Sequence, residues 1–252
     1  MISRWLGGSK GKDNAFEEWQ KQNPSKPFKD FFAQAVTSKL ASGRAHASLG
    51  GNLQSGTYGR TGHQMFKNLR KYGLKEDDNC VDYGCGTLRL GVHVINYLRR
   101  GAYWGLDISD FLLQEGRRLI GDSLWAEKHP NLRLISTESI AEVAALKPPM
   151  LFSVKVLIHI HPDELSEYFR NIMKIIPFSG QAIITGKWSG HETIQISKLG
   201  WAHGLTILED VIKAQGGRIE IVREHECELK GGGQSAKSGI FRIVHERGTA
   251  QL

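Results

Sequence analysis

A glycine pair between two acidic residues carries the clearest chemical signal in this sequence. Gly84 and Gly86 follow Asp82, and Asp107 comes 21 residues after Gly86. The segment predicts a strand, a glycine turn, a helix and a second strand that ends in an acid. In an open α/β sheet such glycines let the backbone approach a ligand, and the acid accepts hydrogen bonds from ribose hydroxyls. The spacing therefore predicts a site for a ligand that contains adenosine.

Asp82 indicates which adenosine ligand this is. It comes just before the turn, where a dinucleotide would place its pyrophosphate, and a carboxylate repels phosphate while it attracts a cation. S-adenosylmethionine carries a sulfonium and an ammonium group and no phosphate. Arg89 stands where the dinucleotide fingerprint needs a third glycine. These residues favour S-adenosylmethionine, and the alternative is a tight turn in some other α/β protein.

The motifs resemble those of a known family. Residues 82–87 (DYGCGT) resemble the first motif of class I S-adenosylmethionine-dependent methyltransferases, and residues 105–108 (GLDI) resemble the second. The string GCGTLR is similar to a bacterial subgroup with a Gly-Cys-Gly-x-Leu-Arg signature. The resemblance runs from about residue 58 to residue 246 and departs from many members at Leu88, where they have glycine, and at Met150, where they have Asp. It implies methyl transfer to an acceptor by direct displacement.

The resemblance also implies which residues contact the cofactor. Residues of the turn and of the following strand end would form its centre, hydroxyls after the third strand would lie toward the adenine, and a lysine after the fourth strand would contact the cofactor or an anionic acceptor. A glycine-punctuated loop over residues 42–62 would close the site, with an arginine near the methionine carboxylate, unless it is only a linker. The candidates are Tyr58, Arg60, Asp82, Gly84, Cys85, Gly86, Asp107, Ile108, Ser136, Thr137 and Lys155.

Catalysis needs alignment of acceptor, methyl group and sulfur, and a general base helps where the acceptor is a hydroxyl or an amine. Ligands lie beyond the carboxyl ends of the strands, and residues 153–162 follow the fourth strand in a segment similar to the family's fourth motif. His159 is the candidate base; the alternative is a structural histidine bonded to the backbone. A second candidate acceptor wall, over residues 186–203, contains Trp188, His191, Trp201 and His203.

The order of expected elements predicts an α/β fold. Strands and helices alternate, which indicates a doubly wound, mostly parallel sheet, and the resemblance implies seven strands with an antiparallel last one. Residues 1–57 would form a helical N-terminal extension and loop, and residues 58–252 the methyltransferase domain. The expected strands are 79–83, 103–108, 132–135, 150–154, 181–185, 219–223 and 240–245, and the expected helices include 63–71, 88–99, 110–120, 138–145, 163–176 and 205–214.

Composition sets the remaining expectations. The 252 residues are 40% hydrophobic and 23% charged, which is ordinary for a globular protein, and the lack of a long apolar run predicts a cytoplasmic protein with no membrane span. Three cysteines without a CxxC pair predict neither disulfides nor a metal site. The net charge of +7 permits nucleic acid as a partner, but its scattered basic residues favour a small-molecule acceptor, such as a sugar or metabolite hydroxyl.

Three other functions compete with this interpretation. An RNA methyltransferase would use the basic surplus for phosphate contacts, and its binding would weaken steeply with salt. A non-catalytic protein could keep the fold for partner binding, and it would have no affinity for S-adenosylmethionine. A nicotinamide-dependent dehydrogenase is opposed by both Asp82 and Arg89. The sequence does not specify the oligomeric state.

Overall fold

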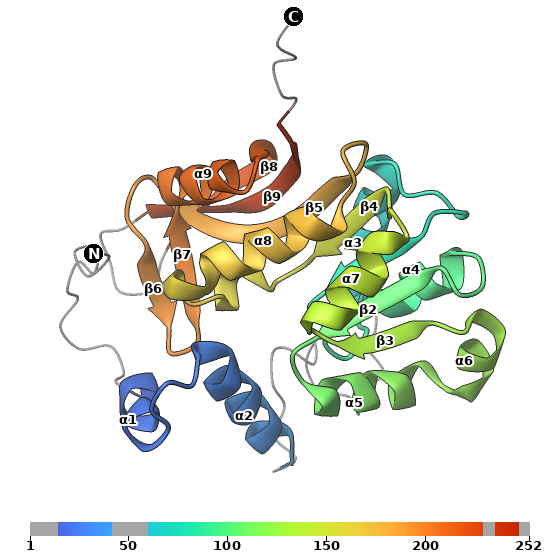
Figure 1. The fold of residues 1–252 in the computed structure, drawn as a ribbon, viewed down its shortest axis with the longest axis horizontal. Coiled ribbons are helices and arrows are strands. Elements are labelled where there is room, and N and C mark those ends of the chain that lie inside the picture. Colours follow the sequence, from blue (N-terminus) through green and yellow to red (C-terminus); the bar gives the residue numbers. More distant parts are fainter. Residues whose placement is uncertain (1–14, 42–59, 229–234, 247–252) are drawn as a thin grey trace, which may run out of the picture.

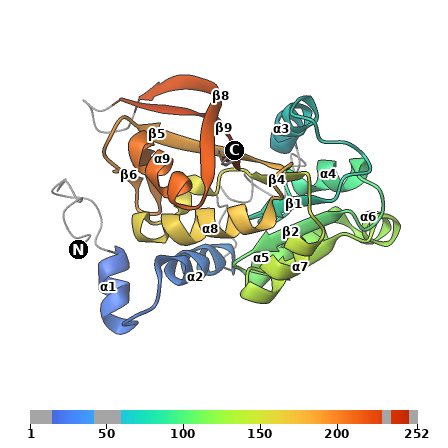
Figure 2. The same ribbon diagram turned by 45° about the horizontal axis from the view of Figure 1, so that its top comes forward.

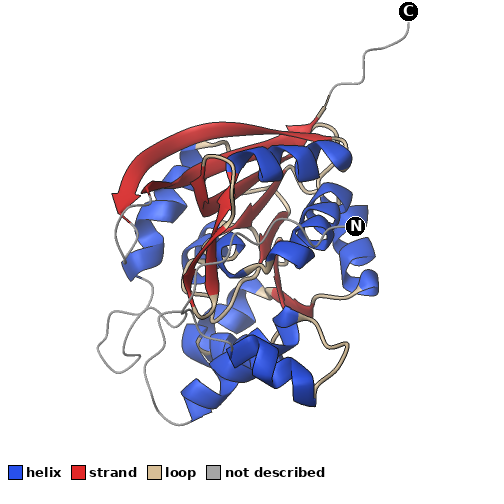
Figure 3. Ribbon diagram, turned by 90° about the vertical axis from the view of Figure 1, so that its left-hand side faces the viewer, coloured by secondary structure: helices blue, strands red, loops and turns tan. Residues whose placement is uncertain are grey.

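The computed structural model describes residues 15–41, 60–228 and 235–246. Its centre is a twisted sheet with helices on both faces (Figures 1 and 3). Along the sheet the strand order is β3-β2-β1-β4-β5, with these five parallel, followed by β9 antiparallel to β5 and β8 antiparallel to β9. These strands are β1 (Cys80–Tyr83), β2 (Tyr103–Asp107), β3 (Asn131–Leu134), β4 (Met150–Ser153), β5 (Gln181–Ser189), β8 (Gly217–Glu228) and β9 (Ser235–His245).

The seven expected strands are thus present, with the last one antiparallel. Two further strands, β6 (Ile194–Ser197) and β7 (Gly200–Gly204), lie within residues 186–204, where no strand was expected. They pair with each other antiparallel, and β7 continues the sheet because it pairs in parallel with the end of β5. The described sheet therefore has nine strands. The alternation Ile194-Gln195-Ile196-Ser197 was the available signal for β6.

Alternation along each strand divides the core into two layers, because successive side chains point to opposite faces of a sheet. Val81 and Tyr83 pack with α7, α8 and α9, whereas Cys80 packs with α3, α4, α5 and α6. The helices are α3 (Arg60–Lys71), α4 (Gly91–Tyr97), α5 (Asp110–Ile120), α6 (Asp122–Lys128), α7 (Thr137–Ala145), α8 (Leu165–Ile175) and α9 (Leu205–Ala214). None of the helices in the described ranges is long and apolar enough to cross a bilayer.

Of the two N-terminal helices, α2 (Phe28–Ala41) lies beside α8 (Figure 2), and α1 (Ala15–Gln22) packs against α2. The side chain of Lys29 forms an ion pair with Glu167 at 2.9 Å, and its backbone N–H donates to the Glu164 carboxylate over 3.0 Å. Phe28 is 2% exposed, and its ring packs edge-on against Trp201 of β7 with 4.8 Å between centroids. Aromatic side chains and one charged pair therefore attach this extension to the rest of the molecule.

Candidate functional site

The loop between β1 and α4 forms a tight turn that requires glycine. Gly84 and Gly86 have φ angles of 82° and 53°, in the left-handed region that side chains disfavour. A Cβ atom at Gly84 would also lie 2.3 Å from Cγ2 of Val156. The N–H of Gly84 donates to the Leu106 carbonyl over 2.7 Å. The turn is therefore fixed against β2 at the carboxyl edge of the parallel strands.

Leu88 occupies the position where many methyltransferases have a third glycine, and it keeps the conformation that glycine would adopt. Its φ is 61°, and its N–H donates to the Cys85 carbonyl over 3.0 Å. A left-handed conformation costs a side-chain-bearing residue about 1–2 kcal/mol. The side chain is fully buried, and burying a leucine contributes about 1.5–3 kcal/mol. Packing of the core therefore offsets the backbone strain at Leu88.

Asp107 ends β2 and binds the turn through its carboxylate. It accepts hydrogen bonds from the N–H of Gly86 at 2.8 Å and from the N–H of Ser109 at 3.0 Å. The residue is 5% exposed, and burial raises its pKa to about 6 while the backbone N–H groups oppose the rise. Each carboxylate oxygen has a second lone pair. Asp107 therefore holds the turn in place and keeps acceptor capacity toward a ligand.

Asp82 lies within β1 under the turn. It is 4% exposed and accepts a hydrogen bond from the Tyr103 hydroxyl at 2.7 Å. Burial raises the pKa of Asp82 to about 8, although the Tyr103 bond lowers it and the Asp107 charge adds to the rise. Two buried acids thus flank the glycines, and a positive charge nearby would favour ionisation of both. Sequence reasoning missed Tyr103, since its role depends on the pairing of β1 with β2.

The other predicted cofactor residues on the β2 and β3 side lie beside Asp107. Ile108 follows Asp107 directly and is half-buried. The Ile135 N–H donates to the Asp107 carbonyl over 2.9 Å, which places the start of α7 next to the end of β2. Ser136 caps α7, because its Oγ accepts from the Ser139 N–H over 3.2 Å, and Thr137 is the first residue of that helix. The Ser136 hydroxyl therefore already has a structural role.

Lys155 follows β4 at the same edge. Its φ is 62°, and its N–H donates to the Thr185 hydroxyl over 2.7 Å. Burial, followed by the nearby Arg89 charge, lowers the pKa of its ammonium group. Arg89 follows the glycine turn, so its proximity to Lys155 shows that the end of β4 lies close to the turn. Cys85, also among the predicted residues, is buried, and burial raises its pKa well above the usual value.

His159, the predicted base, belongs to a short 3-10 helix, η3 (Leu157–His159). Its Nδ1 bonds the Leu199 carbonyl, and a carbonyl oxygen only accepts, so Nδ1 carries the hydrogen. In the neutral ring the basic lone pair is then on Nε2. The ring also packs against Phe32 of α2, with 4.9 Å between centroids. The alternative to a catalytic role was a structural histidine bonded to the backbone, and the bond to Leu199 is such a bond. The same bond also fixes the tautomer that a general base needs.

The second candidate acceptor wall is largely buried. Trp188 and His203 are 2% and 0% exposed. The Nε2 of His203 donates to the Leu157 carbonyl over 3.1 Å, and burial lowers the pKa of His203 to about 4. His203 is therefore a neutral side chain that holds η3 in place through its hydrogen bond to Leu157. Of the four residues singled out in this segment, His191 is exposed and Trp201 packs against Phe28.

Two predicted cofactor residues are not placed by these contacts. Tyr58 lies outside the described residues. Arg60 is the first residue of α3, and its side chain is likewise outside the described part of the chain.

Comparison with known proteins identifies the fold. Neither protein-family models nor curated protein sequences give a match to the chain. Among solved structures, magnesium protoporphyrin IX methyltransferase from Synechocystis PCC 6803 with bound SAH has a TM-score of 0.58 at 15% identity, over 86% of this chain and 98% of that one. The same enzyme with bound SAM gives 0.52 at 16%, over 93% of each chain.

Mitomycin 7-O-methyltransferase gives a TM-score of 0.52 at 15% identity, over 74% of this chain and 54% of that one. At these identities the likeness is one of fold. The chain therefore has the Rossmann-like α/β fold that class I methyltransferases share, with β6, β7 and the N-terminal helices present beside its seven-stranded core.

Proposed function

We propose that this chain is an S-adenosylmethionine-dependent methyltransferase that transfers a methyl group to a small-molecule acceptor. The observation that carries the proposal is the glycine turn of residues 84–86, bound by the buried carboxylate of Asp107 at the carboxyl edge of the sheet. The fold supports it, because the similar solved structures include methyltransferases with bound SAM or SAH.

The residues around the turn fit such a cofactor. Two buried acids, Asp82 and Asp107, lie at the turn, so the site suits a ligand that is positively charged and lacks phosphate. Asp107 would accept hydrogen bonds from the ribose hydroxyls. The Asp82 carboxylate would attract the cationic part of the ligand. The remaining predicted contacts are Tyr58, Arg60, Gly84, Cys85, Gly86, Ile108, Ser136, Thr137 and Lys155.

The cofactor supplies an activated methyl group, so the protein chiefly has to orient the acceptor and exclude water. Residues after β4 and β5 are suited to this task, because they lie at the same edge of the sheet as the turn. In this proposal His159 is the general base: Leu199 fixes its tautomer, and Phe32 packs against its ring. A hydroxyl or amine acceptor would give its proton to Nε2.

Calorimetric titration with S-adenosylmethionine and S-adenosylhomocysteine tests the donor site. We expect one site for each ligand and competition between them. Lack of binding to either would contradict the proposal and favour a non-catalytic protein with this fold. Incubation with radiolabelled methyl donor and fractionated cell extract then tests the acceptor: the label should enter a small-molecule fraction, and label found only in RNA would overturn the acceptor class.

A further inference from the structure

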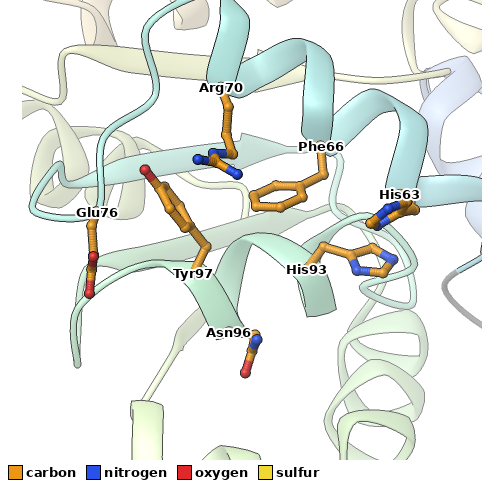
Figure 4. Close-up of a pocket in the computed structure, with 7 residues that line it drawn as sticks. All are labelled: His63, Phe66, Arg70, Glu76, His93, Asn96 and Tyr97. Carbon is orange, nitrogen blue, oxygen red and sulfur yellow. The ribbon is translucent and has the colours of Figure 1, made fainter.

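A groove lies between α3 and α4, on the face of the sheet that these helices cover (Figure 4). Its volume is about 430 Å³, which is within the range of small-molecule sites. The lining combines two aromatic rings, a guanidinium, two imidazoles, an amide and a carboxylate. These side chains belong to His63, Phe66, Arg70, Glu76, His93, Asn96 and Tyr97.

The groove is separate from the residues assigned to the donor site. One end lies near the carboxyl edge, because α3 begins beside the backbone of Arg89, where a Cβ atom at Gly62 would lie 2.4 Å from the Arg89 carbonyl oxygen. The other end lies near the amino edge, because Glu76 precedes β1. None of the groove residues is among those proposed above to hold the cofactor or the acceptor.

The aromatic part of the lining offers surfaces for stacking. The rings of Phe66 and Tyr97 have centroids 5.5 Å apart and meet edge-on, and the His93 ring is stacked on Phe66 at 6.1 Å. All three side chains are half-buried. Planar rings at a solvent-accessible surface are the elements on which proteins stack bases of any sequence. These rings are the part of the lining on which a flat ring from solvent would stack.

A positive charge lies directly beside these rings. The Arg70 guanidinium is 5.1 Å from the centroid of the Tyr97 ring, and Figure 4 shows it between Tyr97 and Phe66. Within the described part of the chain Arg70 forms no ion pair, and it is exposed. The sequence of α3 contains four basic residues and no acid. Glu76 lies on the far side of Tyr97 from the two imidazoles (Figure 4), so an anion in the groove is favoured at the Arg70 guanidinium.

We propose that this groove binds a nucleotide, either free or within single-stranded RNA, with the base against Phe66 and Tyr97 and the phosphate at Arg70. The aromatic rings and the Arg70 guanidinium together indicate this class of ligand. A phosphate alone would make no use of the rings, and an uncharged ring would make no use of the guanidinium. A nucleotide has both groups, and arginine beside stacked bases is a common arrangement in strand-binding proteins.

Uridine nucleotides are the probes for this site, because adenosine compounds could also enter the proposed donor site. Binding of uridine 5′-monophosphate and of an oligouridylate about six nucleotides long, a typical length for such grooves, is measured on the full chain by fluorescence anisotropy or calorimetry. Each titration is repeated with S-adenosylhomocysteine at saturation. We expect binding to persist, since the two sites do not share residues.

Arg70→Gln should weaken binding of both probes by about tenfold, as expected for the loss of one charge-assisted hydrogen bond. Lys213→Gln is the matched control, because it removes one exposed cation from α9 on the opposite face of the sheet; its effect should be less than about twofold, as for a distant screened charge. Phe66→Leu should weaken binding while the thermal midpoint, measured in parallel, verifies that the variant is folded.

The outcomes separate the two sources of the nucleotide. Binding of the monophosphate with no gain from the longer chain assigns the groove to a free nucleotide. Much tighter binding of the oligonucleotide, with affinity falling steeply as salt rises, assigns it to single-stranded RNA. Failure of both probes to bind overturns the proposal, as do equal losses in Arg70→Gln and Lys213→Gln. The proposed methyltransferase activity stands or falls independently, by its own titration with the methyl donor.

Discussion

The proposed donor side and the proposed acceptor side of the carboxyl edge are built in different ways. On the proposed donor side, the buried Asp107 carboxylate fixes the turn through backbone N–H groups, and all of these residues lie between Asp82 and Ser109 in the chain. On the acceptor side, His159 is held by Leu199 and by Phe32, which are 40 and 127 residues away in the chain. Local bonds define one half, and packing of distant segments defines the other.

This difference indicates how the two halves respond to change. A residue of the turn is constrained by its own φ angle and by neighbours in the next strand, so substitution there disturbs stability and donor binding together. The acceptor half depends on side chains from α2, η3 and β7, and substitutions there can change the reaction while the donor half is intact. Four predictions test this separation.

His159→Gln should lower the rate of methyl transfer by about 10²- to 10⁴-fold, the usual contribution of a general base. The affinity for S-adenosylmethionine should not change, because His159 is on the acceptor half. Single-turnover rates and calorimetry on the same preparation measure the two quantities. A rate within about threefold of the unmodified protein, well below the effect of a base, would leave His159 with only its structural contacts.

Gly84→Ala should lower the free energy of unfolding by about 2–5 kcal/mol, because it combines an unfavourable φ with a clash against Val156. Gly216→Ala is the control: its φ of 75° is similar, but no atom lies within 4 Å of a new Cβ. The control should lose only about 1–2 kcal/mol. Urea denaturation of both variants measures the difference, and equal losses would contradict the importance of the Val156 contact.

Asp107→Ala should weaken the binding of S-adenosylmethionine by about 1.5–3 kcal/mol, the range for hydrogen bonds to a charged group. Asp110→Ala, close in sequence but exposed at the start of α5, is the control and should bind normally. Calorimetry measures both affinities. Unchanged affinity in Asp107→Ala would remove this residue from the donor site.

The pH dependence of stability tests the two buried acids of the proposed donor half. The ordinary pKa of an Asp carboxyl is 3.8, and the folded values are about 8 for Asp82 and about 6 for Asp107. Between the ordinary pKa and the folded pKa of each carboxyl, the folded chain binds more protons than the unfolded chain. The free energy of unfolding should therefore fall as pH rises from about 4 to about 8. Asp82→Asn should flatten this fall in urea midpoints, since its amide cannot ionise. A fall of the same size in the variant would mean that other groups cause it.

The sequence was informative where structure is local. The glycine turn and the acid after β2 could be predicted from spacing, and α5 and α9 begin and end at the predicted residues. For α5 the reason is visible in the sequence, because Ser109 caps the helix by accepting the Leu112 N–H over 3.4 Å. The hydroxyl of Ser136, predicted to contact the cofactor, also caps α7 in the structure, a use that its position before a helix could have indicated.

Contacts between distant segments could not be predicted in the same way. Nothing in the local pattern pairs β7 with the end of β5 or brings Phe28 onto Trp201, since both depend on how the whole sheet is completed. The buried state of His203 follows from that pairing as well. The residues expected to line the acceptor pocket were therefore found partly in the core.

Leu88 has a consequence for how the chain moves. A glycine at this bend could change conformation at little cost, whereas a leucine anchored in the interior would have to leave the core before the backbone could rearrange. Opening of the turn over residues 84–88 is thereby coupled to opening of the protein interior. Amide hydrogens from Cys85 to Leu88 should therefore exchange with solvent as slowly as those of the central strands. A ligand of this turn would then bind to a preformed backbone conformation.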